Sequence, residues 1–294
     1  MLSAAPVRAT APTHRPTGET TQMVRVLILS SWVAHGHVGL SAAGPALQAL
    51  GHATTQLPTT LLSNHPGWPH VAAHPMPPDE IGAMLDALEA NGWLSGLDAC
   101  LVGYLPTAGH VDLAAETIGR LRRAARPPRV VVDPILGDLP KGLYIPHAAA
   151  AAIRDRLVPL ADVLTPNRFE LGWLTGADAA TMAEAQAAAS AMVARTGAEV
   201  FVTSPPFGPA ETGILALTGT GIRALRTPLR ADVPHGVGDV FSALIAAGLP
   251  VERALGHLDA LIVASLGAPH LKIAEAAPVW TTAPPCPFPP QAET

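Results

Sequence analysis

Five short apolar runs, rich in β-branched residues, restrict the fold of this 294-residue chain more than any other feature. Each run is almost continuously hydrophobic, which is typical of strands buried on both faces of a parallel sheet. Helical stretches separate the runs, and this alternation predicts an α/β fold with a mainly parallel central sheet. The predicted strands are Val24–Leu29, Ala99–Val102, Arg129–Val132, Asp162–Leu164 and Glu199–Val202.

The segments between these runs have helical character, and several of them are rich in Ala, which favours a helix. Two later apolar runs, Gly213–Leu217 and Ile222–Leu225, are split by Thr218–Gly221 and predict an antiparallel hairpin. A short extra strand is expected at Thr54–Leu57. The predicted helices are Gly39–Leu50, Pro78–Asn91, Val111–Ala125, Ala148–Leu157, Thr181–Thr196, Val240–Ala247 and Val251–Leu266.

The chain has neither an internal repeat nor an interdomain linker, so we expect one domain over residues 23–280. Residues 1–22 are rich in Ala, Pro and Thr and predict a disordered N-terminal extension. This extension has no apolar core of the kind that a secretory signal needs, so we expect a cytoplasmic protein. Residues 281–294, which follow Trp280, are rich in Pro and predict a loose C-terminal tail.

Composition excludes several classes of partner. Hydrophobic residues make up 49% of the chain and charged residues only 14%, which is enough apolar material for a large core. The net charge is −5 without a dense Lys/Arg stripe, so we expect binding neither to nucleic acid nor to an anionic membrane. No apolar run reaches the roughly 18 residues of a membrane helix. The two cysteines predict neither a disulfide framework nor a metal site.

Polar residues follow all five predicted strands, where the carboxyl edge of a parallel sheet binds ligands. One such residue is ordinary turn chemistry, whereas five sets at one edge predict a functional site. The residues are Ser30 and Ser31 after the first strand, Tyr104 after the second, Asp133 after the third, Thr165 and Asn167 after the fourth, and Thr203 and Ser204 after the fifth.

Three carboxylates near this edge are candidate Mg²⁺ ligands, because Mg²⁺ prefers carboxylates, waters and phosphate oxygens. They are Asp133, Asp138 and Glu170. Each also has a plain structural explanation. Asp133 precedes a proline at a strand end, Asp138 lies in a loop, and Glu170 favours the dipole of its own helix.

The segment Gly236-Val237-Gly238-Asp239 is a glycine turn that leads into an apolar helix. Backbone N–H groups at a helix N-terminus suit an anionic group, and glycine lets the backbone approach a phosphate closely. Asp239 could then accept the proton of an attacking hydroxyl, the role of a base in phosphoryl transfer. The structural alternative is an Asp N-cap after a Gly-rich turn.

Other common motifs are missing from the sequence. It has no GxxxxGK[ST] segment and no GxGxxG after the first strand, which argues against a P-loop NTPase and a Rossmann dehydrogenase. The loop histidines His35, His37, His65, His70 and His74 match no usual zinc spacing, so contact with an anionic substrate explains them better.

Taken in order, these motifs resemble the pyridoxal kinases of the ribokinase-like superfamily, over about Val24 to Leu266. The resemblance implies a three-layer α/β/α ribokinase-like fold with a mainly parallel central sheet. The GxGD element indicates only the superfamily, whereas the SNH, GY and DPxxGD segments in this order are more specific. The matching segments are 31–39, Leu62–His65, Val102–Tyr104, Asp133–Asp138, Tyr144–Pro146, Thr165–Glu170 and Gly236–Asp239.

The resemblance implies ATP-dependent phosphorylation of the 5′-hydroxyl of pyridoxal, and it assigns roles to individual residues. Asp239 would be the base, and Gly236, Val237 and Gly238 would form the anion hole. Ser31, His65, Pro66 and Tyr104 would contact the substrate together with Asp239. Asp133 and Glu170 would manage Mg²⁺. The implied ATP contacts are Asp133, Asn167, Glu170, Thr203, Ser204, and Thr227, Pro228 and Leu229 in a loop after the hairpin. A homodimer is also implied, and K⁺ is left open as a further cofactor.

Several residues depart from the family pattern and leave alternatives open. Pro66 follows SNH where Thr or Gln is common, and it has neither a backbone donor nor a hydroxyl. Leu40 replaces a usual Asn, and Val237 replaces the Thr of many members. One alternative is a kinase for another heterocyclic alcohol such as hydroxymethylpyrimidine. The other is a B6-binding homeostasis protein with little activity, which would not need Asp133, Glu170 and Asp239.

Overall fold

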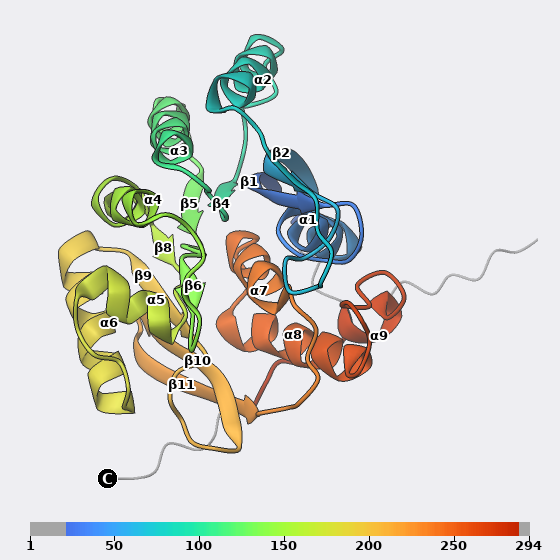
Figure 1. Cartoon of the computed structure of the whole chain (residues 1–294), viewed down its shortest axis with the longest axis vertical. Helices are drawn as coiled ribbons and strands as arrows, with labels where there is room; N and C mark the ends of the chain where they lie inside the picture. Colours follow the sequence, from blue (N-terminus) through green and yellow to red (C-terminus); the bar gives the residue numbers. More distant parts are fainter. Residues whose placement is uncertain (1–21, 288–294) are drawn as a thin grey trace, which may run out of the picture.

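The computed structural model describes residues 22–287, and the rest of the predicted N-terminal extension and residues 288–294 lie outside them. Within the described residues, nine strands form one sheet in the order β11-β10-β9-β8-β5-β4-β1-β2-β3 (Figure 1). The pairs from β2 to β9 are parallel, and β3, β10 and β11 run antiparallel to their neighbours. The strands are β1 (Arg25–Val33), β2 (Ala53–Leu62), β3 (Ala73–Pro75), β4 (Ala99–Val102), β5 (Arg129–Val132), β8 (Val163–Leu164), β9 (Glu199–Thr203), β10 (Glu211–Thr218) and β11 (Gly221–Pro228).

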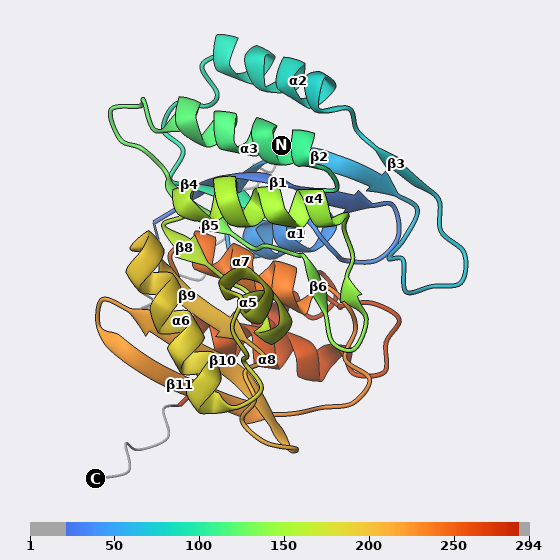
Figure 2. The same ribbon diagram turned by 60° about the vertical axis from the view of Figure 1, so that its left-hand side comes forward.

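Helices cover both faces of this sheet, which gives the expected three-layer α/β/α architecture (Figures 1 and 2). On one side lie α2 (Pro78–Ala90), α3 (Ala108–Leu121), α4 (His147–Ala152), α5 (Arg168–Thr175) and α6 (Met182–Thr196). On the other side lie α1 (Leu40–Ala49), α7 (Val237–Ala246), α8 (Val251–Ser265) and α9 (Ala277–Trp280). Two short helical segments, η1 (Ile153–Leu157) and η2 (Val158–Leu160), and a small separate hairpin, β6 (Gly137–Asp138) and β7 (Gly142–Leu143), complete the elements.

Alternating strand residues supply the two hydrophobic cores, because successive side chains of a strand point to opposite faces. In β1, Leu27 and Leu29 pack with helices α2 to α6, whereas Val26 and Ile28 pack with α1, α7 and α8. Both sets are buried. The near-continuous apolar runs of the sequence therefore correspond to strands with two buried faces, as predicted.

The first two strands are longer than predicted. Strand β1 extends to Val33, so that Ser31 lies inside the strand rather than in a loop after it. Strand β2 extends past Pro58 to Leu62, although proline is unfavourable in a central strand. The register with β1 shifts between Ser30 and Ser31, where Pro58 and Thr59 form an irregularity in β2 that accommodates the proline.

The described part of the C-terminal segment is packed, which differs from the loose tail expected after Trp280. The Trp280 indole is fully buried and donates a hydrogen bond from Nε1 to the Ile273 carbonyl at 2.8 Å. Further along, the Cys286 N–H donates to the Glu252 carbonyl of α8 at 2.8 Å. Apolar packing of Trp280 against the second core overrides the proline-rich composition. No helix among residues 22–287 is long and apolar enough to span a membrane.

Candidate functional site

Asp239 lies in the first turn of α7, at the carboxyl edge of the sheet. Gly236 is the N-cap and has φ = 100°, a left-handed conformation that glycine adopts easily. A Cβ at this position would overlap the carbonyl oxygen of His37, so the turn has no room for a side chain. Burial raises the pKa of Asp239 to about 6, and the N–H groups of Gly39 and of Asp239 itself oppose this shift by donating to the carboxylate.

Asp133 directly follows β5 and faces Asp239 across a cavity. The cavity is also lined by residues of β1, β4, α1 and α7, including Ser30, Leu101 and Ser242. The Asp133 carboxylate accepts a hydrogen bond from the Ser242 hydroxyl at 2.8 Å. Burial raises the pKa of Asp133 well above its ordinary value, and the charges of Glu170 and Asp239 raise it further.

Glu170 is held by its own helix N-terminus. The Asn167 side chain accepts from the Glu170 N–H at 3.0 Å while Glu170 accepts from the Asn167 N–H at 2.8 Å, which is a capping box. The other carboxylate oxygen of Glu170 accepts from the Leu136 N–H at 2.8 Å. Burial nevertheless raises its pKa to about 7. Glu170 therefore caps its own helix, as the structural explanation predicts. It also lies near enough to Asp133 for its charge to raise the pKa of that residue.

The three carboxylates Asp133, Asp138 and Glu170 do not form a ready-made metal cage. Among residues 22–287 no group of three or more His, Cys, Asp or Glu side chains is placed to hold one ion. The charge of Glu170 raises the pKa of Asp133 and the charge of Asp138 raises that of Glu170, so the three carboxylates are near neighbours. Their gathering around Mg²⁺ stays a prediction, and both oxygens of Glu170 also accept from backbone N–H groups. Mg²⁺ needs only one or two carboxylates when phosphates and waters complete its shell. Asp133 and the buried, unpartnered Oδ1 of Asp138 suit that kind of site.

On the substrate side, Ser31 lies in β1 and Tyr104 follows the neighbouring strand β4. The Tyr104 N–H donates to the Ser30 hydroxyl at 3.1 Å, and the Tyr104 carbonyl accepts from the Thr59 hydroxyl at 2.6 Å. Thr59 belongs to the irregularity of β2, so this irregularity fixes the loop that carries Tyr104. Sequence reasoning overlooked Thr59, because a threonine inside a strand gives no functional signal.

His65 contacts His235, the residue directly before the glycine turn. Their rings stack with centroids 3.7 Å apart and an interplanar angle of 22°. The Gly67 N–H donates to His65 Nδ1 at 3.0 Å, so the other ring nitrogen carries the proton. Burial lowers the pKa of His65 to about 4, with further lowering by His235 and Lys141. Pro66, beside this pair, is exposed.

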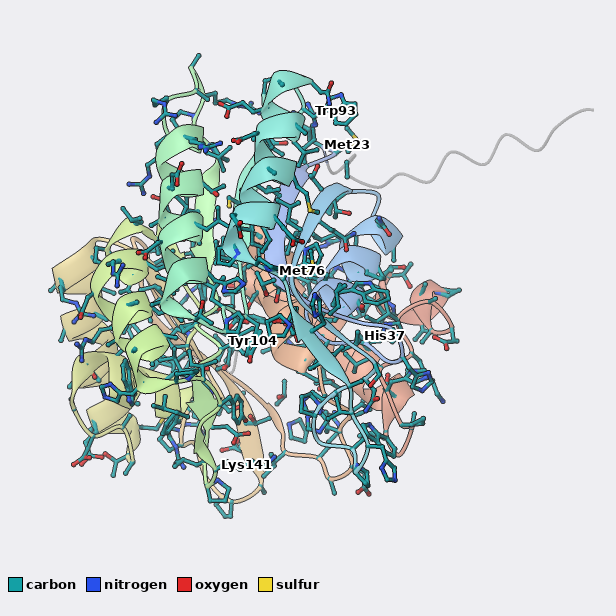
Figure 3. The ribbon with its side chains drawn as sticks, turned by 45° about the horizontal axis from the view of Figure 1, so that its top comes forward. Met23, His37, Met76, Trp93, Tyr104 and Lys141 are labelled. Atoms are coloured by element: carbon teal, nitrogen blue, oxygen red, sulfur yellow. The ribbon has the colours of Figure 1, made fainter. Side chains whose placement is uncertain are left out.

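Lys141 lies near these rings, and its charge lowers the pKa of both His65 and His235. His37, Tyr104 and Lys141, which are labelled in Figure 3, follow β1, β4 and β6 respectively. A cavity next to the stacked pair is lined by several imidazoles and one indole. The lining side chains include His35, His37, His65, Trp68, His235 and His270. Sequence reasoning grouped His35, His37 and His65 as loop residues, but not His235 or His270, which lie more than 150 residues away.

The residues expected at the nucleotide also lie at this edge of the sheet. Thr203 ends β9 and forms a bridge with Asn167, which brings these two together. Ser204 follows with φ = 50° and donates its N–H to the Gly213 carbonyl at 3.1 Å. Thr227 and Pro228 belong to the end of β11, opposite β10, and not to a loop after the hairpin as expected. Only Leu229 lies beyond the strand, where it is exposed.

Comparisons with known proteins show what this chain is similar to. Residues 36–259 match the family model described as phosphomethylpyrimidine kinase. The chain is 37% identical over 253 residues to a pyridoxine/pyridoxal/pyridoxamine kinase of Bordetella avium, covering 84% of this chain and 86% of that protein. It is 37% identical over 230 residues to a pyridoxal kinase of Deinococcus radiodurans, covering 74% and 76%. It also resembles the pyridoxal kinase of Leishmania donovani, solved with ADP and pyridoxamine. That match has a TM-score of 0.80 and 28% identity, and covers 89% of this chain and 97% of that chain.

Proposed function

Because this chain belongs to the pyridoxal kinase family, we propose that it transfers the γ-phosphoryl group of ATP to the 5′-hydroxyl of pyridoxal. The product is pyridoxal 5′-phosphate, and pyridoxine and pyridoxamine are further acceptors. The observation that carries the proposal is the position of Asp239, a carboxylate with a raised pKa at the mouth of a glycine turn that begins a helix. This combination provides a base beside an anion-binding turn.

In this mechanism positioning and electrostatics provide most of the catalysis. Asp239 accepts the proton of the 5′-hydroxyl as the oxygen attacks the γ-phosphorus. The backbone N–H groups of Gly236, Val237 and Gly238 stabilise the negative charge on the transferred group. Ser31, His65, Pro66 and Tyr104 surround the acceptor ring.

The nucleotide binds along the same edge of the sheet. Asn167, Thr203 and Ser204 contact phosphate oxygens, and Thr227, Pro228 and Leu229 flank the base. Asp133 would hold Mg²⁺, with Glu170 contributing charge from its capped position. When bound, Mg²⁺ offsets the negative charge of the ATP phosphates.

Four broader features are part of the same proposal. The dimer and K⁺ rest on the family resemblance, whereas the cytoplasmic location and the domain bounds rest on composition. The chain is a homodimer in the cytoplasm, and K⁺ is a candidate further cofactor. The kinase domain covers residues 23–280, and the packed residues around Cys286 extend it. Light scattering of the purified protein, and activity with K⁺ exchanged for a larger organic cation, test the dimer and the cation separately.

The direct test is ADP release by the purified protein with Mg²⁺ and ATP, with and without pyridoxal. We expect pyridoxal-dependent turnover, and we expect Asp239→Ala to reduce kcat by about 10²- to 10⁴-fold, the usual contribution of a general base. The matched variant Asp239→Asn keeps the shape of the side chain and should lose the same activity. Normal turnover in either variant would remove Asp239 from the role of base.

A second candidate is phosphorylation of another heterocyclic alcohol, such as hydroxymethylpyrimidine. Two observations favour it: the description of the matching family model, and Pro66 beside the substrate-side His65. A panel of alcohols at equal concentration separates the two candidates by kcat/KM. If pyridoxal binds saturably without turnover, the chain is instead a B6-binding protein.

A further inference from the structure

Ser242 is a buried hydroxyl that lies between the two halves of the site. It lies three residues after Asp239 in α7, on the same side of the helix, and it lines the cavity between Asp239 and Asp133. Its Oγ donates to Asp133 Oδ2 at 2.8 Å and lies 2.8 Å from the hydroxyl of Thr165. Ser242, Thr165 and Asp133 are all less than one-tenth exposed.

The direction of these hydrogen bonds follows from the number of protons available. A serine hydroxyl has a single proton, and Ser242 donates it to Asp133 Oδ2. With that proton used, Ser242 accepts from the Thr165 hydroxyl. The resulting chain, Thr165 to Ser242 to Asp133, joins the ends of β8 and β5 to the helix that carries Asp239.

A strained residue also donates a hydrogen bond to the same carboxylate. Ile135 has φ = 42°, which is rare for a β-branched residue. In this conformation its N–H donates to the Asp133 carboxylate. The fold thus maintains an unfavourable backbone conformation and a buried serine around one carboxylate, and strain of this kind is concentrated at functional sites.

We propose that Ser242 is a positioning residue, which holds Asp133 in the orientation that receives Mg²⁺ and the nucleotide phosphates and aligns it with Asp239. The proposal rests on the proposed function for the identity of the ligand. It explains why a buried polar side chain lies on the largely apolar helix α7, between Phe241 and Ala243. Ser242 itself touches no reacting atom in this assignment.

The test measures nucleotide binding, which does not require turnover. The Kd of ADP is determined by calorimetry with Mg²⁺ and again with EDTA, for the wild type and for Ser242→Ala. Alanine is favourable in a helix, so the variant should fold. We expect Mg²⁺ to strengthen ADP binding to the wild type, and we call the ratio of the Kd in EDTA to the Kd with Mg²⁺ the Mg²⁺ gain. This ratio should fall by roughly tenfold in Ser242→Ala. The Kd of ADP in EDTA should differ by less than about twofold between the variant and the wild type.

Two further variants separate positioning from general damage. Thr165→Val removes the donor to Ser242 but leaves the bond to Asp133, so it should reduce the Mg²⁺ gain in the same direction by a smaller factor. Thr117→Val removes a buried hydroxyl of α3 that bonds only to the Leu113 carbonyl, and it should leave the gain unchanged. If Ser242→Ala does not fold, the Thr165→Val result decides.

Three results would overturn the proposal: an unchanged Mg²⁺ gain in Ser242→Ala, an equal loss with and without Mg²⁺, or a wild type whose ADP binding ignores Mg²⁺. The proposed function fails in a different way. A wild type that binds ADP more tightly with Mg²⁺ but phosphorylates no B6 vitamer would refute the function and leave the role of Ser242 intact.

Discussion

At the residue scale, the chemistry of the site depends on burial more than on close charge pairs. Burial is the largest cause of the raised pKa of Asp239, Asp133 and Glu170 alike. Backbone N–H groups then partly stabilise each ionised form. A carboxylate whose pKa is raised toward 7 in this way is a better base than an exposed one, because its affinity for a proton is higher.

The pH dependence of catalysis should therefore identify Asp239. Only the ionised carboxylate accepts a proton, and its pKa is about 6. We predict that kcat/KM for pyridoxal decreases about tenfold per pH unit as the pH falls below 6. His65 remains neutral throughout, because its pKa is lowered to about 4. The measurement is a rate profile from pH 5 to 8.

Glu170, with a pKa of about 7, can add a second step to this profile. The residual activity of Asp239→Ala is the control, since the step near pH 6 should disappear from its profile while any Glu170 step stays. A step near pH 6 that survives in the variant would assign it to another group.

At the scale of elements, the start of α7 decides what the glycine turn can do. The two glycines of the turn have different surroundings, although the sequence presents them as equivalent. A Cβ on Gly236 would overlap a carbonyl oxygen, whereas a Cβ on Gly238 would meet no atom within 4 Å. Gly236 is therefore required by the fold, and Gly238 faces open space beside the site.

Alanine at each position should separate folding from catalysis. We predict that Gly236→Ala lowers the free energy of unfolding by at least about 2 kcal/mol, because of its left-handed φ and the overlap with His37. Gly238→Ala should keep its stability within about 0.5 kcal/mol. Its kcat should still fall at least about tenfold, because the methyl group fills the space that the phosphoryl group needs.

Urea unfolding and ADP release measure the two effects on the same samples. Full activity in a stable Gly238→Ala variant would show that the phosphoryl group does not bind at this turn.

At the scale of the whole molecule, residues far apart in sequence form single structures. The stacked pair joins His65 to His235, and the cavity beside it adds residues near positions 37 and 270. The C-terminal segment likewise packs on α8, where Gly256 lies directly against the Pro284 carbonyl. The second core is therefore completed only when the chain returns past Trp280.

This packing predicts the sign of a substitution. Ala is normally more favourable than Gly inside a helix by about 1 kcal/mol. Gly256→Ala should nevertheless destabilise the protein by about 1–3 kcal/mol, because the new methyl group would overlap Pro284. Gly119→Ala on α3 is the matched control, since its Cβ meets no atom, and it should stabilise the protein. Thermal unfolding compares the two, and stabilisation by Gly256→Ala would mean that the segment is not packed in solution.

The strand pattern, the hairpin and the edge of the sheet that carries the site were predictable from local signals. Apolar runs identified β4 and β5 to the residue, and the segment Thr218–Gly221 correctly marked the turn between β10 and β11. Local signals failed at Pro58, where the neighbouring strand and an irregularity accommodate a residue that normally ends a strand. They failed again at Trp280, where a proline-rich composition concealed a buried anchor.

By itself, the sequence determined the α/β class, the order of the strands along the chain, the glycine turn with Asp239 and the family resemblance. These features depend on residues that are neighbours in the chain, or on a period of two or 3.6 residues. Only the tertiary structure decided that Ser242 and Ile135 hold Asp133, that His235 stacks on His65, and that backbone groups occupy both oxygens of Glu170. Such contacts join residues from different elements, and their geometry depends on how the whole sheet twists and packs, which no local pattern encodes.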